Sequence, residues 1–237
     1  MHTFLDSKPM AKALRTALAE RGFNVTHSES LELVARQFGF ANWNMLNARI
    51  DAAQLPVLQL PAGWHVAGGT NERNYRLGLD PGVPGAALIE SRPDRAAAID
   101  RAAGETGVLM QSILADPWRG KRLRLTAELR TDEAETATIW MRVDPASGRY
   151  LHFDNLMQRP GETLTGTTGW TQRHIVLDVP EAAATIHYGF LLRGAGRVWS
   201  RRFSLEVVGA DVAVTEPGPR YLDGPTNLDF GSSQPTA

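Results

Sequence analysis

The chain has 237 residues, a formal net charge of −1 and no cysteine. The lack of cysteine excludes disulfides, thiolate zinc sites and cysteine nucleophiles, and the balanced charge gives no long-range attraction to nucleic acid or an anionic membrane. Because the N-terminus has no apolar core of signal-peptide length and no segment approaches membrane-spanning length, we expect a cytoplasmic protein.

The first part of the chain has a helical pattern. The run from Met10 to Arg21 is rich in strong helix formers and stops at Gly22. Thr26 and Glu29 have the spacing of a capping box, which predicts that a second helix starts there. A third helix is expected at about residues 42–52. The sequence therefore predicts a small helical bundle over residues 1–52.

A proline-containing segment follows the predicted bundle. Pro56 and Pro61 disfavour helix in the residues before them, so residues 53–62 are expected to form an extended linker. The composition changes on either side of this segment, which predicts two separately folding parts.

From residue 63 onward the pattern changes to strands and turns. Leu123, Leu125, Ala127 and Leu129 alternate with polar residues, and three later segments up to Val207 alternate in the same way. Repeated half-buried strands separated by turns predict an antiparallel, jelly-roll-like β-sandwich over 63–230, and an α+β chain as a whole. Residues 231–237 are expected to be a disordered tail, and the side chains expected to hold the preceding residues on the sandwich are Tyr221, Leu222 and Phe230.

Two segments resemble known families. Residues 11–50, with the core THSESLELVARQFGFANWN, resemble the small glyoxalase-related helical domain that often precedes glyoxalase or bleomycin-resistance domains. The remainder resembles a galactose-binding-like β-sandwich domain of unknown function that also occurs appended to bacterial regulators. The segments that carry this resemblance include Trp118–Leu125, residues 139–144 and Gly166–Trp170. The second resemblance implies a fold similar to carbohydrate-binding jelly rolls, and neither implies a known reaction.

The polar face of one predicted hairpin is the leading candidate site. If Asp144 faces Tyr150, then Arg142 lies opposite His152 and Trp140 lies opposite Asp154. An aromatic ring beside charged groups and an imidazole could bind a sugar or another flat ligand. The alternative is simple cross-strand pairing on the wet face of the sheet.

A second candidate lies at the sandwich rim, where Trp118, Trp170 and Trp199 fall beside polar residues. We favour the hairpin face slightly over this rim as the ligand site. The predicted ligand-binding residues are Trp140, Arg142, Tyr150, His152, Asp154, Trp170 and Trp199.

The sequence offers no recognisable catalytic or metal motif. The six histidines have no metal-ligand spacing, His27 falls in a helix cap, and no Gly-x-Ser-x-Gly elbow is present. The Gly194–Gly196 segment joins two predicted strands, so it indicates a tight turn rather than a nucleotide loop. We therefore predict no catalytic residue, no metal and no cofactor.

The function predicted from these patterns is non-enzymatic: ligand or partner binding by the sandwich, with an accessory helical domain that docks a protein. A small molecule or a carbohydrate is the expected ligand, and no membrane partner is expected. One alternative is a DNA-binding regulator, because the third helix offers Asn42, Asn44, Asn47 and Arg49. A single cation gives little phosphate contact, so nucleic acid is disfavoured. Another alternative is a glyoxalase-related enzyme or accessory subunit.

Overall fold

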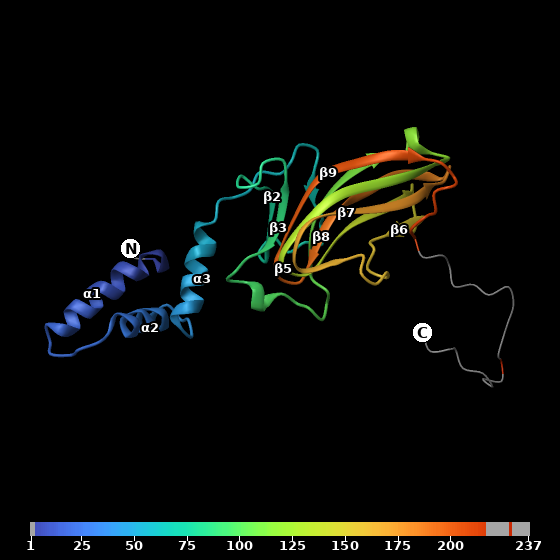
Figure 1. Ribbon diagram of the computed structural model, residues 1–237. Helices are drawn as coiled ribbons and strands as arrows, with labels where there is room; N and C mark the ends of the chain where they lie inside the picture. The colour runs from blue at the N-terminus through green and yellow to red at the C-terminus, as the bar shows by residue number, and fades with distance from the viewer. Residues whose placement is uncertain (1–2, 217–227, 229–237) are drawn as a thin grey trace.

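The computed structural model describes residues 3–216 and residue 228, with residues 52–54 described in backbone only. Its N-terminal part is helical (Figure 1), with a 3-10 turn at Phe4–Asp6 followed by α1 (Ser7–Ala19), α2 (His27–Gln37) and α3 (Trp43–Gln54). The predicted capping box is confirmed, because Thr26 N donates to Glu29 at 2.7 Å and Glu29 N donates to the Thr26 hydroxyl at 3.2 Å. These helices have a hydrophobic core of their own, formed by Ala11, Val34, Ala35, Leu46 and Ile50.

In the rest of the described chain, the regular secondary structure is almost entirely antiparallel strands. Their bounds are β1 (His65–Val66), β2 (Tyr75–Leu79), β3 (Ala87–Ser91), β4 (Thr106–Leu114), β5 (Lys121–Pro145), β6 (His152–Asp154), β7 (Leu164–Val179), β8 (Ala183–Arg193) and β9 (Arg197–Val208). Short 3-10 turns occur at Ala96–Ala98 and Asp116–Trp118. The chain is thus a helical bundle followed by an antiparallel β-sandwich, as the sequence predicted.

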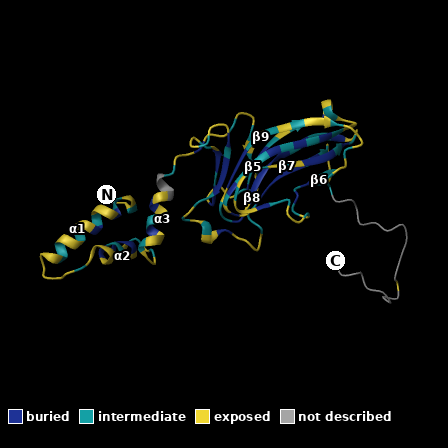
Figure 2. Cartoon of the chain, in the orientation of Figure 1, coloured by how far each residue is buried: buried dark blue, intermediate teal, exposed yellow. Residues whose placement is uncertain are grey.

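The long strand β5 builds the sandwich by running through both of its layers. Its first part pairs with β7 and β9, and its last part pairs with β6 and β8. Strands β3 and β2 complete the first layer, and we call this whole layer the platform sheet. Strands β4 and β1 complete the second layer. Figure 2 shows the buried positions along these strands, and most of them form one core that contains Leu125, Ile139, Ile175 and Phe190.

The turn between β8 and β9 lies where β5 passes from one layer to the other. Gly194 and Gly196 have φ angles of +78° and +109°, and a Cβ at Gly196 would overlap the Glu133 carbonyl. Only glycine fits so close an approach at this φ. The prediction of a tight turn here is confirmed.

The predicted linker lies against the platform sheet. Leu79 N donates to the Gln59 carbonyl at 2.7 Å, and Arg76 Nη1 donates to the Pro56 carbonyl at 2.8 Å. Leu58 is only 8% exposed and packs in a small cluster with Leu88. The segment between helices and sandwich therefore packs against the edge strand β2.

The domain boundaries at residues 52, 62 and 230 stay predictions. Besides the linker, an ion pair joins the helical part to the β-rich part, because Arg49 of α3 lies 2.6 Å from Asp94. Tyr221, Leu222, Phe230 and the tail over 231–237 lie outside the described residues. None of the described helices is long and apolar enough to cross a membrane.

Candidate ligand-binding site

The predicted register of the β5–β6 hairpin is wrong by one residue. The structure pairs Val143 with His152, Arg142 with Phe153 and Met141 with Asp154. Because side chains alternate between faces, a shift of one residue moves His152 and Asp154 to the face opposite Arg142.

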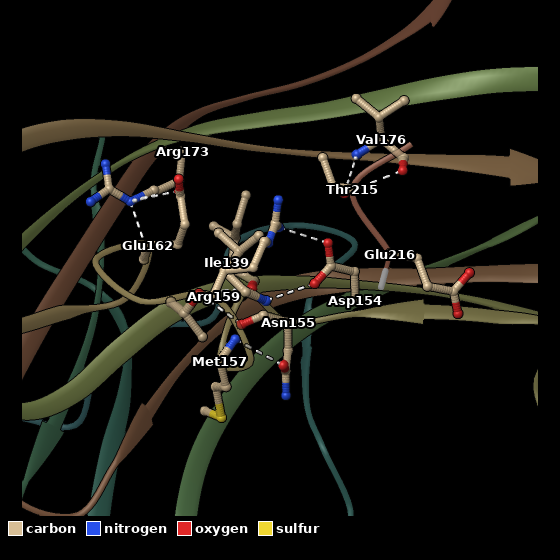
Figure 3. Close-up of polar contacts among 12 residues, drawn as sticks. Ile139, Asp154, Asn155, Met157, Arg159, Glu162, Arg173, Val176, Thr215 and Glu216 are labelled. Carbon is tan, nitrogen blue, oxygen red and sulfur yellow. Dashed lines mark hydrogen bonds and ion pairs between the residues drawn. The ribbon is translucent and has the colours of Figure 1, made fainter. Parts of the chain in front are cut away.

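The cause of the shift is the loop that follows β6. Asp154 is 4% exposed and stabilises this loop, since its Oδ1 accepts from Leu156 N at 2.8 Å and its Oδ2 accepts from Arg159 at 2.8 Å (Figure 3). Leu156 is completely buried in the core. The chain therefore buries Leu156 and turns Phe153 outward, whereas the sequence pattern had placed Phe153 inside.

The hairpin residues do not form one surface. Trp140 is only 7% exposed and packs with Met110, Leu191 and Phe153 on the outer side of the second sheet. His152 contacts Glu216 on the chain segment after β9, with 2.6 Å between Nδ1 and Oε2. The expected exposed cluster of Trp140, Arg142, Tyr150, His152 and Asp154 is therefore not present in this form.

The two remaining predicted residues, Trp170 and Trp199, are brought together on the platform sheet. They project from the outer face of β7 and β9, on either side of Arg130 in β5, which pairs directly with Trp199. The Arg130 guanidinium carbon lies 4.2 Å from the Trp199 ring centre and 5.4 Å from that of Trp170. We call Trp170, Arg130 and Trp199 the Trp–Arg row. A cation held over aromatic rings is stabilised by about 0.5–2 kcal/mol per contact.

The neighbouring segments fix the Trp199 ring. Its Nε1 donates to Asp80 at 2.5 Å, and the ring packs against Leu58 and Leu88. Leu58 comes from the predicted linker, so this segment supports the row directly. Trp199 is 7% exposed, whereas Trp170 is only partly buried.

Charged groups on the same face are mostly paired. Glu128 accepts from Arg201 at 2.7 Å and from Arg202 at 2.9 Å, and the hydrogen bond from Arg201 is the main cause that lowers the Glu128 pKa. Arg201 also lies 3.9 Å from the ring centre of Trp170. The carboxylate of Asp132 is paired with Arg197.

A shallow hollow of about 450 Å³ adjoins the Trp–Arg row. It is lined by Leu58, Asp80, Ala86 and several prolines of the linker and the β2–β3 turn. Two of its lining residues, Leu58 and Ala86, belong to the same packed cluster as Trp199. An apolar hollow with a few polar groups at its edge is the usual form of a small-ligand site.

A polar row on the second sheet contains Ser112, His187 and Asp144. The Ser112 hydroxyl is 2.8 Å from His187 Nδ1, and His187 Nε2 is 3.0 Å from the Thr185 hydroxyl and 3.4 Å from Asp144 Oδ2. Burial lowers the pKa of His187, which Asp144 partly opposes. Ser112 and Asp144 lie on opposite ring nitrogens of His187, so the three side chains form one connected polar group.

The third helix uses its polar side chains within the molecule. Asn42 accepts from Met45 N at 2.9 Å, Asn47 donates to Asp51 at 2.9 Å, and Arg49 pairs with Asp94. Three of the four side chains proposed for DNA contact are therefore already engaged.

Among the described residues, no group of three or more His, Asp or Glu side chains gathers in a way that could hold a metal ion.

The N-terminal part of the chain is similar to a known family. Residues 1–75 match the family model "Glyoxalase superfamily protein", which confirms the resemblance at the N-terminus. A curated relative from Bacillus subtilis (strain 168), named as an uncharacterized HTH-type transcriptional regulator, is 44% identical over 131 residues. This match takes in 54% of the chain and 43% of the relative, so the chain spans less than half the length of that protein. A match of 131 residues necessarily includes part of the β-rich region.

Solved structures similar to the chain include carbohydrate-binding modules. A family 22 module of Clostridium thermocellum Xyn10B is 10% identical, with a TM-score of 0.44 over 62% of this chain and 88% of that one. A structure described as "CBM4 structure and function" is 14% identical, with a TM-score of 0.41 over 65% of this chain and 96% of that one.

Sequence reasoning missed Arg130 and Arg201 as site residues. Arg130 belongs to the alternation Glu128–Leu129–Arg130, which marks it as outward-facing but says nothing about its neighbours across the sheet. Its position between the two tryptophans depends on the pairing of β5 with β7 and β9, and neither register could be derived from one sequence. Trp118, the third residue of the predicted rim, lies in the 3-10 turn before β5 and contacts Lys121 instead.

Proposed function

We propose that the protein is a non-enzymatic ligand-binding protein, and that the outer face of the platform sheet binds a carbohydrate or a similar hydroxylated ligand. The observation that carries the proposal is the Trp–Arg row, where two tryptophans clamp an arginine on an outward face beside an apolar hollow. Rigid aromatic groups with fixed donors at their edges bind polar ligands with little loss of side-chain entropy.

The helical part is proposed to be an accessory domain that docks a protein partner. Its family match supports a glyoxalase-related role as an alternative, and the relative named as a transcriptional regulator supports a sensory role beside a DNA-binding partner. The engaged side chains of Asn42, Asn47 and Arg49 give the DNA-reading alternative less support than ligand binding.

Affinity electrophoresis in gels containing soluble polysaccharides tests the proposal. We expect wild-type protein to be retarded by at least one polysaccharide from a panel of xylan, galactan and polygalacturonate. Trp170→Ala should abolish the retardation, because Trp170 holds both Arg130 and Arg201 in place.

Tyr150→Ala is the matched control, since Tyr150 is an exposed aromatic residue at the hairpin that was first predicted to bind ligand. This variant should be retarded like wild type. Loss of retardation in Tyr150→Ala with full retardation in Trp170→Ala would move the site to the hairpin and contradict the proposal.

A further inference from the structure

Arg130 differs from the other arginines on its face in having no carboxylate partner. Arg197, Arg201 and Arg202 are paired with Asp132 or Glu128. In the part of the chain that the structure describes, the guanidinium of Arg130 has no hydrogen bond or ion pair, and its ring contacts are with Trp170 and Trp199. Its N–H donors therefore depend on solvent or on a ligand, although the side chain is partly buried.

The side chains around the Trp–Arg row carry one more positive charge than negative charges. Four guanidinium groups, those of Arg130, Arg197, Arg201 and Arg202, face the three carboxylates of Asp80, Glu128 and Asp132. A ligand group with a single negative charge would neutralise this excess. A guanidinium is flat and matches a carboxylate through two parallel N–H···O bonds.

We infer that the ligand carries a carboxylate, as a uronic acid sugar does, and that Arg130 binds this carboxylate. The inference rests on the proposed function and names its ligand class. Trp170 and Trp199 hold the guanidinium in place, and Arg201, already paired with Glu128, stays near the same edge. The adjacent hollow gives space for the rest of the sugar.

Titration calorimetry with trigalacturonate and with its uncharged methyl ester tests the inference on the full chain. We expect wild type to bind the acid more tightly than the ester. Arg130→Gln should weaken binding of the acid about tenfold or more, the scale of a lost charged hydrogen-bonded pair, and leave binding of the ester unchanged. Arg130→Lys should recover only part of the loss, because an ammonium lacks the planar fork.

Arg124→Gln is the matched control. Arg124 lies on the same outward face of β5 but is paired with Glu206, so its loss should not change either affinity. Urea unfolding of each variant separates lost binding from lost folding.

Three outcomes distinguish failure of the carboxylate inference from failure of the proposed function. Equal binding of acid and ester by wild type, with both lost in Trp170→Ala, would overturn the carboxylate inference and retain the site. Binding of the acid that survives both Arg130→Gln and Trp170→Ala would overturn both. Failure to bind either trisaccharide, beside retardation in a neutral polysaccharide gel that Trp170→Ala abolishes, would overturn the inference alone.

Discussion

The amide of Leu79 donates a 2.7 Å hydrogen bond to the carbonyl of Gln59, so the segment before the sandwich is paired with its edge. At the neighbouring Gly78, φ is +146° and an added Cβ would lie 2.6 Å from the same Gln59 oxygen and from Leu58 Cβ. The backbone of β2 thus approaches the segment so closely that a side chain cannot fit between them.

This contact predicts where a stable sandwich fragment begins. A fragment starting at Leu55 should be more stable to urea than one starting at Pro61, because the shorter fragment loses the buried Leu58 side chain and the acceptor for Leu79. In the full chain, Leu58→Ala should lower the unfolding free energy by about 2 kcal/mol. Equal urea midpoints for the two fragments would show that the segment does not stabilise the sandwich.

Gly78→Ala should be strongly destabilising. The backbone strain at φ +146° and the overlap with residues 58 and 59 together predict a loss of about 2 kcal/mol or more in the unfolding free energy. Gly69→Ala is the control, because nothing lies within 4 Å of the added Cβ there. If both variants unfold at the wild-type urea concentration, residues 58 and 59 do not lie as close to β2 as the structure shows.

Trp140 is expected to be a stability residue. Since it is 93% buried in an apolar cluster, Trp140→Ala should cost about 3–5 kcal/mol of unfolding free energy. Tyr150→Ala, at an exposed ring, should change it by less than about 0.5 kcal/mol. Similar small effects for both would show that Trp140 is not packed in the cluster with Met110 and Leu191.

The lowered pKa of His187 should cause part of the pH dependence of the unfolding free energy. Burial lowers its pKa in the folded chain below the ordinary value of 6.5, so the unfolded chain binds the proton more readily. Its contribution to stability is therefore present above pH 6.5 and is lost as the pH falls through and below that value.

Urea unfolding at pH 7.5 and pH 5.5 measures this contribution. His187→Gln should lose less stability between the two values than wild type does, whereas His174→Gln, at an exposed position on β7, should keep the wild-type difference. An unchanged pH difference in His187→Gln would show that burial does not lower the pKa of this imidazole.

The sequence was sufficient for features that depend on local chemistry. The capping box at Thr26, the turn at Gly194–Gly196 and the alternation in the first part of β5 are all read within short segments, and each has the predicted structure. The hairpin register was different, because the pattern around Phe153 fits either face. The choice depends on Asp154 holding the following loop and on Leu156 entering the core, which are contacts that alternation does not encode.

The candidate site required long-range pairing. Trp170 and Trp199 were predicted to bind ligand, yet the partner that joins them comes from a strand some forty residues before Trp170 in the sequence. Alternation predicts which side chains face outward but gives no information on which strands are neighbours. The central role of Arg130 follows only from the assembled sheet.

The most direct test of the Trp–Arg row uses the indole N–H signals of the six tryptophans in a ¹⁵N–¹H spectrum of the full chain, each assigned by a Trp→Phe variant. On titration with trigalacturonate, the signals of Trp170 and Trp199 should shift together, while that of Trp140 on the opposite sheet stays in place. Saturable shifts of Trp140 with unmoved signals from Trp170 and Trp199 would contradict the account.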